Sequence, residues 1–580
     1  MPTLDRRTFV TQLSALGLGG AFVDALWAGV QDQEEVTTAI VREAEVVAGL
    51  DFTEDEREMM VRGLNQHLEA YRAIRRVPLP NGVPPAVRFD ARLPHFPDPG
   101  AVDHEPEGRF ESVRPARQGT VQRPSELESV AFWPVTKLAA LIRTGQVTSV
   151  ELTEMYLDRL RRHGPTLEAV ITRTEELATR QARRADAELA AGVYRGPLHG
   201  IPWGAKDLLS TEGYRTTWGA KPYEEQMIPE DAAVVRRLEE AGAVLVAKLT
   251  LGALAMGDRW YGGRTRNPWD LEQGSSGSSA GSAAATVAGL VGFGIGTETL
   301  GSIVSPCTRT GATGLRPTFG RVSRHGAMAL SWTMDKIGPI CRSAEDCALV
   351  FAAIHGADGK DPTARTVPFH YDGGRPLSDL RVGYLRAGFE REARGRDEAA
   401  RERARQAIRL DNAALDVVRR LGIDPIPVTL PEGLPVSALR IILNAEAAAA
   451  FDDLTRSGRD DLLVAQESWS WPNAFREARM IPAVEYIQAN RIRTMVMGEM
   501  EKLMADVDVF ITPSYAGNVL LTTNLTGHPA VVVPNGFIDG HPTSVSFIGN
   551  LWRDDAALRL ASAYQRATDF HARVPEEFAG

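Results

Sequence analysis

Cysteine is scarce in this chain: only three occur among its 580 residues. So low a number excludes a disulfide-stapled scaffold, and an odd number leaves at least one free thiol in a monomer. Cys341 and Cys347 lie close in sequence and Cys307 lies upstream, but no histidine sits at the spacing that a zinc site with them would need. We therefore expect no zinc site at these cysteines.

Neither positively nor negatively charged residues are in large excess. The 65 Lys and Arg residues against 75 Asp and Glu residues give a net charge of −10, so the chain lacks the basic excess typical of nucleic-acid binders. Hydrophobic residues make up 43% and charged residues 24%, which is ordinary for a soluble globular protein and excludes disorder and a multi-span membrane protein. Composition predicts a large soluble protein of enzyme size, without a nucleic-acid partner; it leaves the oligomeric state open.

The apolar run near the N-terminus is shorter than the ~20 residues that cross a membrane. It spans residues 13–23, is rich in Gly and Ala, and follows the paired Arg6 and Arg7. We interpret residues 1–30 as a twin-arginine-like export signal, which predicts an exported, periplasmic protein. Asp24 weakens the cleavage site, so retention as a membrane anchor is one alternative, and a buried N-terminal helix is another.

Residues 31–130 have the character of an accessory segment. Thr53 and Glu56 form a capping-box pattern, and Met60, Leu64 and Leu68 then repeat at helical spacing. From residue 78 to 99 the chain is dense in proline and poor in hydrophobic residues, which is typical of an extended strap. We expect an N-terminal helical and proline-rich extension outside the catalytic body.

Residues 131–580 alternate between helical and strand patterns. A second capping box, Thr148 to Glu151, opens a helix, and a long helical stretch is predicted at 167–191. Further helices are predicted at 232–241, 281–289, 344–355 and 555–570, and strands at 243–247, 291–295, 380–385, 507–512, 529–534 and 544–548. Such alternation predicts an α/β fold with a mixed, mostly parallel central sheet covered by helices.

Between residues 274 and 326 the composition shifts sharply toward Gly, Ser, Ala and Thr. A phosphate cradle is a weak interpretation, because no Gly-Lys-Ser/Thr follows the glycines at 292–296. A flexible linker is the usual meaning of such composition, but Ala, Val and Leu are interleaved at packable spacing. The third interpretation is a site with a serine nucleophile.

Several separate motifs, in order along the chain, resemble the amidase signature family. They are Gly200-Ile201-Pro202-Trp203-Gly204-Ala205-Lys206-Asp207, Asn267-Pro268-Trp269-Asp270, Gly277-Ser278-Ser279-Ala280-Gly281-Ser282, Gly301-Ser302-Ile303, Gly314-Leu315-Arg316-Pro317-Thr318-Phe319-Gly320-Arg321-Val322-Ser323 and Asp335-Lys336-Ile337-Gly338-Pro339. The similarity covers roughly residues 135–575. It implies the family's fold and an amidase that needs no cofactor.

The resemblance also implies a Ser-Ser-Lys triad. By position, Ser302 would be the nucleophile, Ser278 the bridging serine on a cis peptide bond, and Lys206 the base. The backbone N–H groups of Thr299, Leu300, Gly301 and Ser302 would form the oxyanion hole. Ser279 and Ser282 are interpreted as helix-start residues.

Physical chemistry supports these assignments independently. A serine hydroxyl needs a neighbour to take its proton, and a lysine can do so only when neutral. Burial among apolar neighbours lowers a lysine pKa by up to ~3–5 units without any carboxylate. Lys206 lies between Ile201-Pro202-Trp203 and Leu208-Leu209, a context that suits a buried base.

Departures from the family pattern concern the substrate more than the mechanism. Leu300 stands where the family has glycine, and Val304 stands where arginine is common. Leu300 keeps its N–H but adds a side chain and disfavours a positive φ. Ala280 and Glu298 replace the more usual glycine and aspartate.

The leading hypothesis is an exported amidase that cleaves a linear carboxamide of a small molecule through an acyl-serine intermediate. An esterase or carbamate hydrolase is a close variant, and a non-catalytic binding protein on the same fold is the alternative. The family's tRNA-dependent amidotransferase component fits poorly, because export would separate it from tRNA. We expect pocket walls from the 430–480 region and from the strap. For Trp469 and Trp471 in the 430–480 region, an apolar pocket wall and core packing are both open, and core packing is the preferred interpretation.

Overall fold

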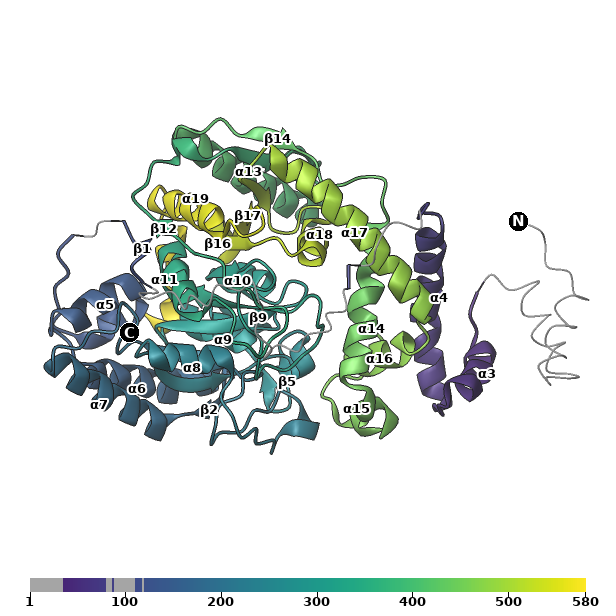
Figure 1. Ribbon diagram of the computed structural model, residues 1–580, viewed down its shortest axis with the longest axis horizontal. Coiled ribbons are helices and arrows are strands. Elements are labelled where there is room, and N and C mark those ends of the chain that lie inside the picture. Colours follow the sequence, from purple (N-terminus) through teal and green to yellow (C-terminus); the bar gives the residue numbers. More distant parts are fainter. Residues whose placement is uncertain (1–34, 80–85, 88–109, 117–118, 580) are drawn as a thin grey trace, which may run out of the picture.

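The computed structural model describes residues 35–79, 86–87, 110–116 and 119–579 (Figure 1). The predicted export signal at 1–30 and most of the proline-rich strap lie outside these residues. Within the described part of the chain, no helix combines the length and the apolar character needed to cross a membrane.

One eleven-stranded sheet runs through the molecule. From edge to edge its strands are β14 (Ile426–Val428), β13 (Val382–Leu385), β15 (Val509–Pro513), β17 (His541–Gly549), β16 (Ala530–Ile538), β10 (Thr313–Arg316), β11 (Lys336–Cys341), β9 (Phe293–Glu298), β3 (Pro202–Lys206), β4 (Val244–Leu249) and β2 (Val170–Arg173). Three small two-stranded sheets pair β1 (Val113–Arg114) with β12 (Tyr371–Asp372), β5 (Arg259–Trp260) with β6 (Gly263–Arg264), and β7 (Arg266–Asn267) with β8 (Asp270–Gly274).

The predicted α/β fold with a mixed sheet covered by helices is confirmed, with a smaller parallel share than expected. Parallel pairing joins β14 to β13, β13 to β15, β9 to β3 and β3 to β4. The other neighbours are antiparallel. The physical reason is that some successive strands are connected without a crossover helix: β16 returns directly as β17 through a turn at Asp539 and Gly540, both with positive φ.

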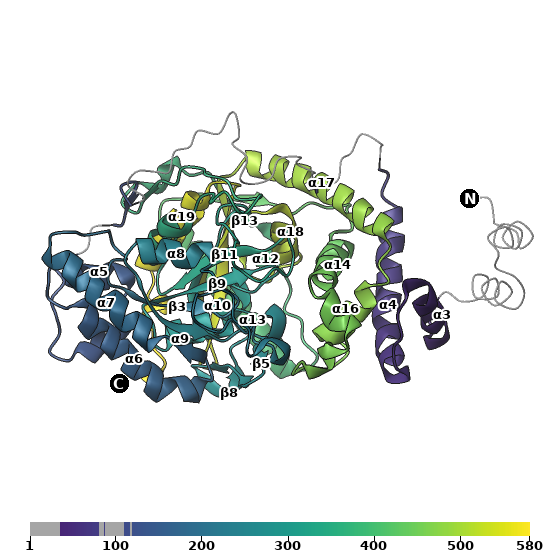
Figure 2. The same ribbon diagram turned by 60° about the horizontal axis from the view of Figure 1, so that its bottom comes forward.

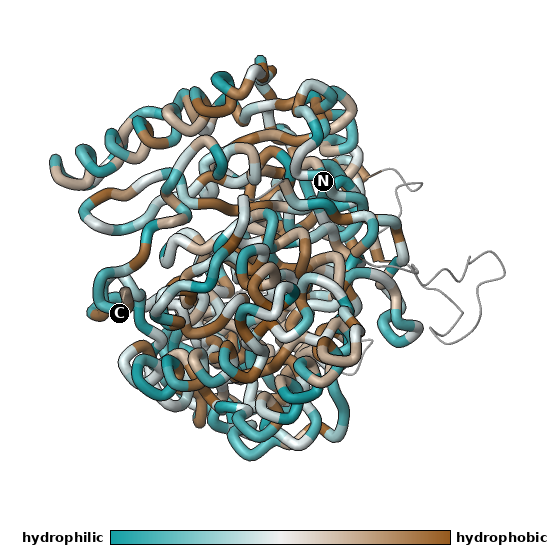
Figure 3. Tube along the Cα trace, turned by 90° about the vertical axis from the view of Figure 1, so that its left-hand side faces the viewer, coloured by the Kyte–Doolittle hydropathy of each residue, from teal (hydrophilic) through white to brown (hydrophobic). Residues whose placement is uncertain are grey.

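Helices cover both faces of the sheet. α9 (Ala280–Val287) and α10 (Val304–Thr310) lie on one face, and α11 (Ala344–Ile354) and α19 (Asp554–Arg566) lie on the other. Strand alternation produces this division: Val532 packs with Cys307 of α10, whereas Val531 and Val533 belong to the core that contains α11 and α19. Hydrophobic stretches accordingly concentrate inside the trace, and hydrophilic ones follow the outer helices (Figure 3).

The predicted helix at 167–191 is wrong in its first part. α6 (Ser149–Leu167) ends where Glu168 takes a positive φ of 49°, and α7 (Glu175–Ala190) begins only after β2. Val170 and Thr172 are β-branched residues that pair with the edge of β4, so tertiary pairing overrides the local helical pattern. The capping box between Thr148 and Glu151 is confirmed, as are α8 (Ala233–Glu240) and α9 within a few residues.

The remaining helices surround the sheet and its loops. They are α5 (Val135–Arg143), α12 (Arg386–Phe389), α13 (Glu398–Arg420), α14 (Ile441–Ala450), α15 (Asp452–Arg456), α16 (Trp471–Ala478), α17 (Ala483–Ala505) and α18 (Val519–Thr526). The 3₁₀ helix η5 (Val436–Arg440) precedes α14. On the long α13, Arg401, Arg403 and Arg409 are exposed to solvent.

The described part of the N-terminal extension forms two helices, α3 (Thr38–Ala48) and α4 (Glu54–Arg75). The predicted capping box of Thr53 and Glu56 is present. α4 lies beside α14, α16 and α17, at the end of the molecule opposite α5–α7 (Figures 1 and 2). The Arg75 guanidinium pairs with Glu485 of α17 at 2.6 Å, and the Tyr71 hydroxyl donates to the Met480 carbonyl at 3.4 Å. These contacts attach α4 to the body.

Candidate functional site

Lys206 ends strand β3, which lies between β9 and β4, third from the β2 edge of the sheet. Its side chain is fully buried. Its ammonium nitrogen donates a hydrogen bond of 2.8 Å to Ser278 Oγ. Two of the residues that the sequence assigns to one site are therefore in direct contact.

Ser278 precedes helix α9 in the loop 275–279. The Gly277–Ser278 peptide bond is cis, as the family resemblance implies for this serine. The loop passes so close to Gly257 that a Cβ on Gly277 would lie 1.8 Å from the Gly257 carbonyl oxygen. The Ser276 N–H also donates to Asp258 Oδ2 at 3.0 Å. Only glycine allows this approach, which places the loop against the segment 257–258.

Two further hydroxyl groups hold the Lys206 nitrogen, and the sequence analysis missed both. Ser279 Oγ accepts from Lys206 Nζ at 3.1 Å and Thr297 Oγ1 accepts at 2.9 Å. Ser279 Oγ also donates to the Thr297 carbonyl at 3.1 Å. Ser279 stands at the start of α9, as expected, but makes no side-chain capping bond there. The position of Ser279 directly after Ser278 is the sequence feature that could have indicated its contact with Lys206.

Burial lowers the pKa of Lys206 to about 7, against the opposing effect of the Asp335 and Glu298 carboxylates. Three neutral hydroxyl groups accept hydrogen bonds from the Lys206 nitrogen, and they compensate a buried charge less than a carboxylate does. A substantial fraction of Lys206 is therefore neutral near pH 7 and able to accept a proton.

The turn after strand β9 carries Ser302, which is 8% exposed. The Ser302 carbonyl accepts a 3.1 Å hydrogen bond from the Ser279 N–H, so the turn is fixed against the start of α9. Gly301 has a φ of 91°, a conformation that favours glycine. Leu300 is not among the described residues with positive φ. Its side chain therefore does not cause the strain that a positive φ would bring at this position.

The carboxylate of Glu298 holds the turn that carries Ser302. One carboxylate oxygen accepts from the N–H groups of Ile303 and Val304, both at 2.9 Å. The other accepts from Arg316 and from Asn524, both at 2.8 Å. Burial raises the pKa of Glu298, but the Arg316 guanidinium and these hydrogen bonds outweigh it and hold the pKa at about 2. The residue is an ionised structural anchor.

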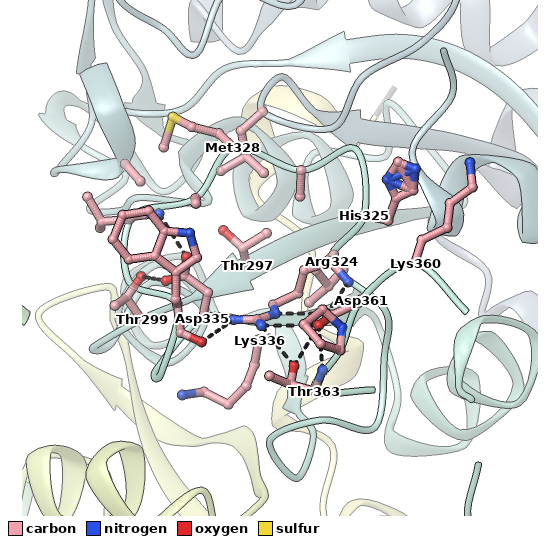
Figure 4. A pocket seen from close by; sticks show the side chains of 18 residues that line it. Thr297, Thr299, Arg324, His325, Met328, Asp335, Lys336, Lys360, Asp361 and Thr363 are labelled. Atoms are coloured by element: carbon pink, nitrogen blue, oxygen red, sulfur yellow. Dashed lines mark hydrogen bonds and ion pairs between the residues drawn. The ribbon is translucent and has the colours of Figure 1, made fainter. Parts of the chain in front are cut away.

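A cavity of about 310 Å³ opens beside Thr297 and Thr299 (Figure 4). Thr299 Oγ1 donates to Asp335 at 2.5 Å. Trp332, Met328 and Lys336 also line this space. Thr297 thus lies between the cavity and the Lys206 nitrogen. The described residues contain no cluster of three or more His, Cys, Asp or Glu side chains suited to a metal ion.

The three cysteines are buried and free. Cys307 faces the core beneath α10, and burial raises its pKa well above the usual value, so it is a poor nucleophile. The interpretation of the two tryptophans as core residues is confirmed for Trp471 and wrong for Trp469, which is 62% exposed.

Comparisons with known proteins show the family to which the chain belongs. The family model described as Amidase matches residues 151–520. A protein of Roseiflexus sp. (strain RS-1), named as a subunit of glutamyl-tRNA(Gln) amidotransferase, is 37% identical over 75% of this chain and 96% of its own length. A protein of the same name from Methylococcus capsulatus is 34% identical over 77% of this chain and 99% of its own. The structure of native peptide amidase from Stenotrophomonas maltophilia superposes with a TM-score of 0.66 at 30% identity, covering 76% of this chain and 97% of that one.

Proposed function

Since the chain belongs to the amidase family, we propose that it hydrolyses the C–N bond of a linear carboxamide through an acyl-serine intermediate. One observation carries the proposal: Lys206, with a pKa of about 7, donates a 2.8 Å hydrogen bond to Ser278. A buried lysine at this pKa can cycle between neutral and protonated forms during one turnover.

In the proposed first step, Ser302 Oγ attacks the amide carbonyl carbon. Its proton passes to Ser278 Oγ while the Ser278 proton passes to neutral Lys206 Nζ. Lys206 then returns a proton through Ser278 to the departing nitrogen, which leaves as ammonia or an amine. The acyl group remains on Ser302 as an ester. A water molecule releases the acid by the same proton path.

The negative oxygen of the intermediate needs donors at the turn that carries Ser302. We assign this role to the backbone N–H groups of Thr299, Leu300, Gly301 and Ser302. Glu298 occupies the next two N–H groups, of Ile303 and Val304, so these do not contribute. One donor of this kind is typically worth ~3–4 kcal/mol in the transition state.

Labelling of the whole protein with a fluorophosphonate tests the activated serine without knowledge of the substrate. Intact-mass measurement should show one adduct on the wild type and on Ser305→Ala, whose serine lies one turn further along. The adduct should be absent from Ser302→Ala. A folded wild type without any adduct would favour the non-catalytic binding protein.

An amidotransferase component is a second candidate, because the relatives from Roseiflexus and Methylococcus carry that name. The two functions share the acyl-serine step and differ in the acceptor of the released ammonia. Ammonia release from simple amides by the isolated chain supports the hydrolase; release confined to glutamine supports the amidotransferase. Hydrolysis assays that also include esters and carbamates identify the type of bond that the protein prefers.

We also propose export, on the paired Arg6 and Arg7 before the apolar run. Replacing both by lysine should retain the protein inside the cell, with the unaltered chain as control. Equal distribution of both chains between fractions would contradict export and strengthen the amidotransferase alternative.

A further inference from the structure

A second cavity, of about 500 Å³, lies between α4, α16 and the segment formed by η5 and α14. We call it the α4 pocket. Its polar lining includes Arg62, Gln66, His67, Arg440, Asn444 and Glu477. α4 precedes residue 151, where the family match begins, so this wall is an addition to the part of the chain that the family describes.

Two guanidinium groups of the α4 pocket lack partners within the described part of the chain. Arg62 comes from α4 and Arg440 from the end of η5. Both are exposed, and neither has an ion pair or hydrogen bond to a described residue. Most arginines elsewhere on α4 differ; Arg57, for example, pairs with Glu45 at 2.8 Å. A guanidinium group can bind a carboxylate through two parallel hydrogen bonds, so two unpaired ones beside one cavity suit a ligand with a carboxylate.

A buried histidine adds a third polar group. His67 is 6% exposed, and its Nδ1 has no hydrogen-bond partner among the described residues. Its Nε2 lies 3.4 Å from Asn444 Nδ2. Burial lowers the pKa of His67 to about 4, so the ring is neutral at physiological pH. A neutral imidazole that lines a cavity with one nitrogen free is ready to bond a polar ligand.

Trp469 supplies an apolar surface at the same cavity. Its indole is 62% exposed, whereas the neighbouring Trp471 is buried and donates to the Leu254 carbonyl at 2.9 Å. The Arg259 guanidinium lies over the Trp469 ring at 5.2 Å and pairs with Glu467 at 2.7 Å. Trp469 is therefore held in place while a large part of its ring stays open for contact with a ligand.

The carboxyl group of Glu477 in this lining opposes an anion less than an ordinary glutamate does. Glu477 accepts a 2.7 Å hydrogen bond from Asn473 and lies against Gly63, where a Cβ would meet its carboxyl group at 1.9 Å. Burial raises the pKa of Glu477 to about 7, which leaves it substantially protonated at neutral pH.

Residues of the α4 pocket are connected, through intermediate contacts, to the loop that carries Ser278 and to the turn that carries Ser302. Met256 lines it, and Asp258, two residues on, accepts from Ser276 in the loop of the bridging serine. On the other side, Ser437 lines it and accepts a 3.3 Å bond from Asn518. Asn518 directly precedes α18, whose Leu520 would lie 3.1 Å from a Cβ on Gly301. One lining residue of the pocket thus precedes the segment that contacts the Ser278 loop, and another contacts the start of the helix that packs against Gly301, the residue before Ser302.

We propose that the α4 pocket binds a carboxylate group of the amide substrate, remote from the bond that is cleaved, with Arg62 and Arg440 as its ligands and Trp469 packing against the intervening chain. This inference rests on the proposed amidase function. It makes the N-terminal helix a determinant of substrate choice.

Two series of chromogenic amides test the inference. One consists of ω-carboxyacyl p-nitroanilides, from succinyl to suberyl, and the other of N-acyl-4-aminobenzoates; each is compared with its methyl ester. The proteins are the full chain, Arg62→Gln, Arg440→Gln and, as matched control, Arg76→Gln, an exposed arginine at the end of α4 outside the pocket. Binding of the same compounds to Ser302→Ala, alone and with each arginine substitution, is measured by calorimetry.

The expected result is a preference for the free acid over the ester in at least one series. Either pocket substitution should reduce kcat/KM for the acid by about tenfold or more, through KM, and leave the ester unchanged. Arg76→Gln should match the wild type. If the chain proves inactive on every amide, calorimetry still decides: tight binding of the acid that Arg62→Gln weakens supports the pocket. No preference for the acid, or a preference that both substitutions leave intact, would overturn it.

Discussion

Lys206 and Lys248 are both fully buried on neighbouring strands, but in the described part of the chain only Lys248 has a carboxylate within ion-pair distance. Lys248 Nζ lies 2.8 Å from Asp207 Oδ1, whereas three hydroxyl groups surround Lys206 Nζ. Lys206 is paired in register with Leu249, so the two lysines point to opposite faces of the sheet. The same residue type therefore serves as a paired structural charge on one face and as a candidate base on the other.

The first prediction concerns the pH dependence of turnover. Since the base must be neutral, kcat/KM for a neutral amide should rise with pH and level off above the Lys206 pKa of about 7. Lys206→Arg, whose guanidinium does not deprotonate in this range, should lose activity by about a thousandfold or more at every pH. A flat profile between pH 5.5 and 8.5, or an active Lys206→Arg, would contradict the assignment.

The second prediction concerns stability. The folded-state pKa of Lys206 is lowered below its unfolded value of 10.5, so between pH 7 and 10.5 the unfolded chain binds more protons than the folded one. Stability from this group therefore rises with pH across that window. The difference in unfolding free energy between the wild type and Lys206→Met, which removes the titration, should shift in favour of the wild type from pH 7 to pH 10.

Urea unfolding at several pH values measures this difference. Lys248→Met is the control, because its partner Asp207 compensates the charge in the fold. A difference between Lys206→Met and the wild type that stays constant over the window would show that Lys206 remains protonated in the folded protein.

The third prediction separates Ser279 from Ser282, two buried serines on the same turn of α9. Ser279 Oγ contacts Lys206 Nζ, whereas Ser282 Oγ donates to the Ile295 carbonyl at 2.9 Å and does not reach the lysine. Ser279→Ala should lower kcat by about 10- to 100-fold and shift the pH profile, because Lys206 loses a positioning contact. Ser282→Ala should change stability alone. Equal pH profiles for both variants would make Ser279 merely structural.

Much of the fold follows from local patterns in the sequence. The helix starts at Thr53 and Thr148 were predicted because capping boxes are short-range signals. β2 was missed, since its pairing with β4 joins Val170 to Leu249 across the chain. The parallel share of the sheet was overestimated for a similar reason: helix–strand alternation does not report which strands become neighbours.

The candidate site likewise contains residues that the sequence predicts and residues that only the fold reveals. Lys206, Ser278 and Ser302 stand in recognisable motifs, and the structure brings the first two into direct contact. Thr297 and Glu298 were not predicted as supports, because the groups they hold are defined only by the fold: Thr297 meets a strand end distant in sequence, and Glu298 meets Arg316. The contribution of α4 to a pocket likewise depends on packing between segments about 400 residues apart.

The last prediction concerns the anchor beneath the catalytic turn. In Glu298→Gln, one end of the amide presents a donor either to the N–H groups of Ile303 and Val304 or to Arg316 and Asn524, so donor faces donor in either orientation. The buried Arg316 also loses its counter-charge. We expect a loss of about 3–5 kcal/mol in unfolding free energy, and slower fluorophosphonate labelling of the fraction that remains folded.

Glu446→Gln is the matched control for this variant. Glu446 is also buried, but hydroxyl groups of Ser331, Thr333 and Tyr486 make most of its hydrogen bonds, and hydroxyls can rotate to accept as well as donate. Its replacement should cost less stability and leave the labelling rate of Ser302 unchanged. Because both variants remove one buried negative charge, a slower labelling rate in Glu298→Gln alone would assign the effect to the turn. Equal labelling rates would show that the turn keeps its shape without the carboxylate.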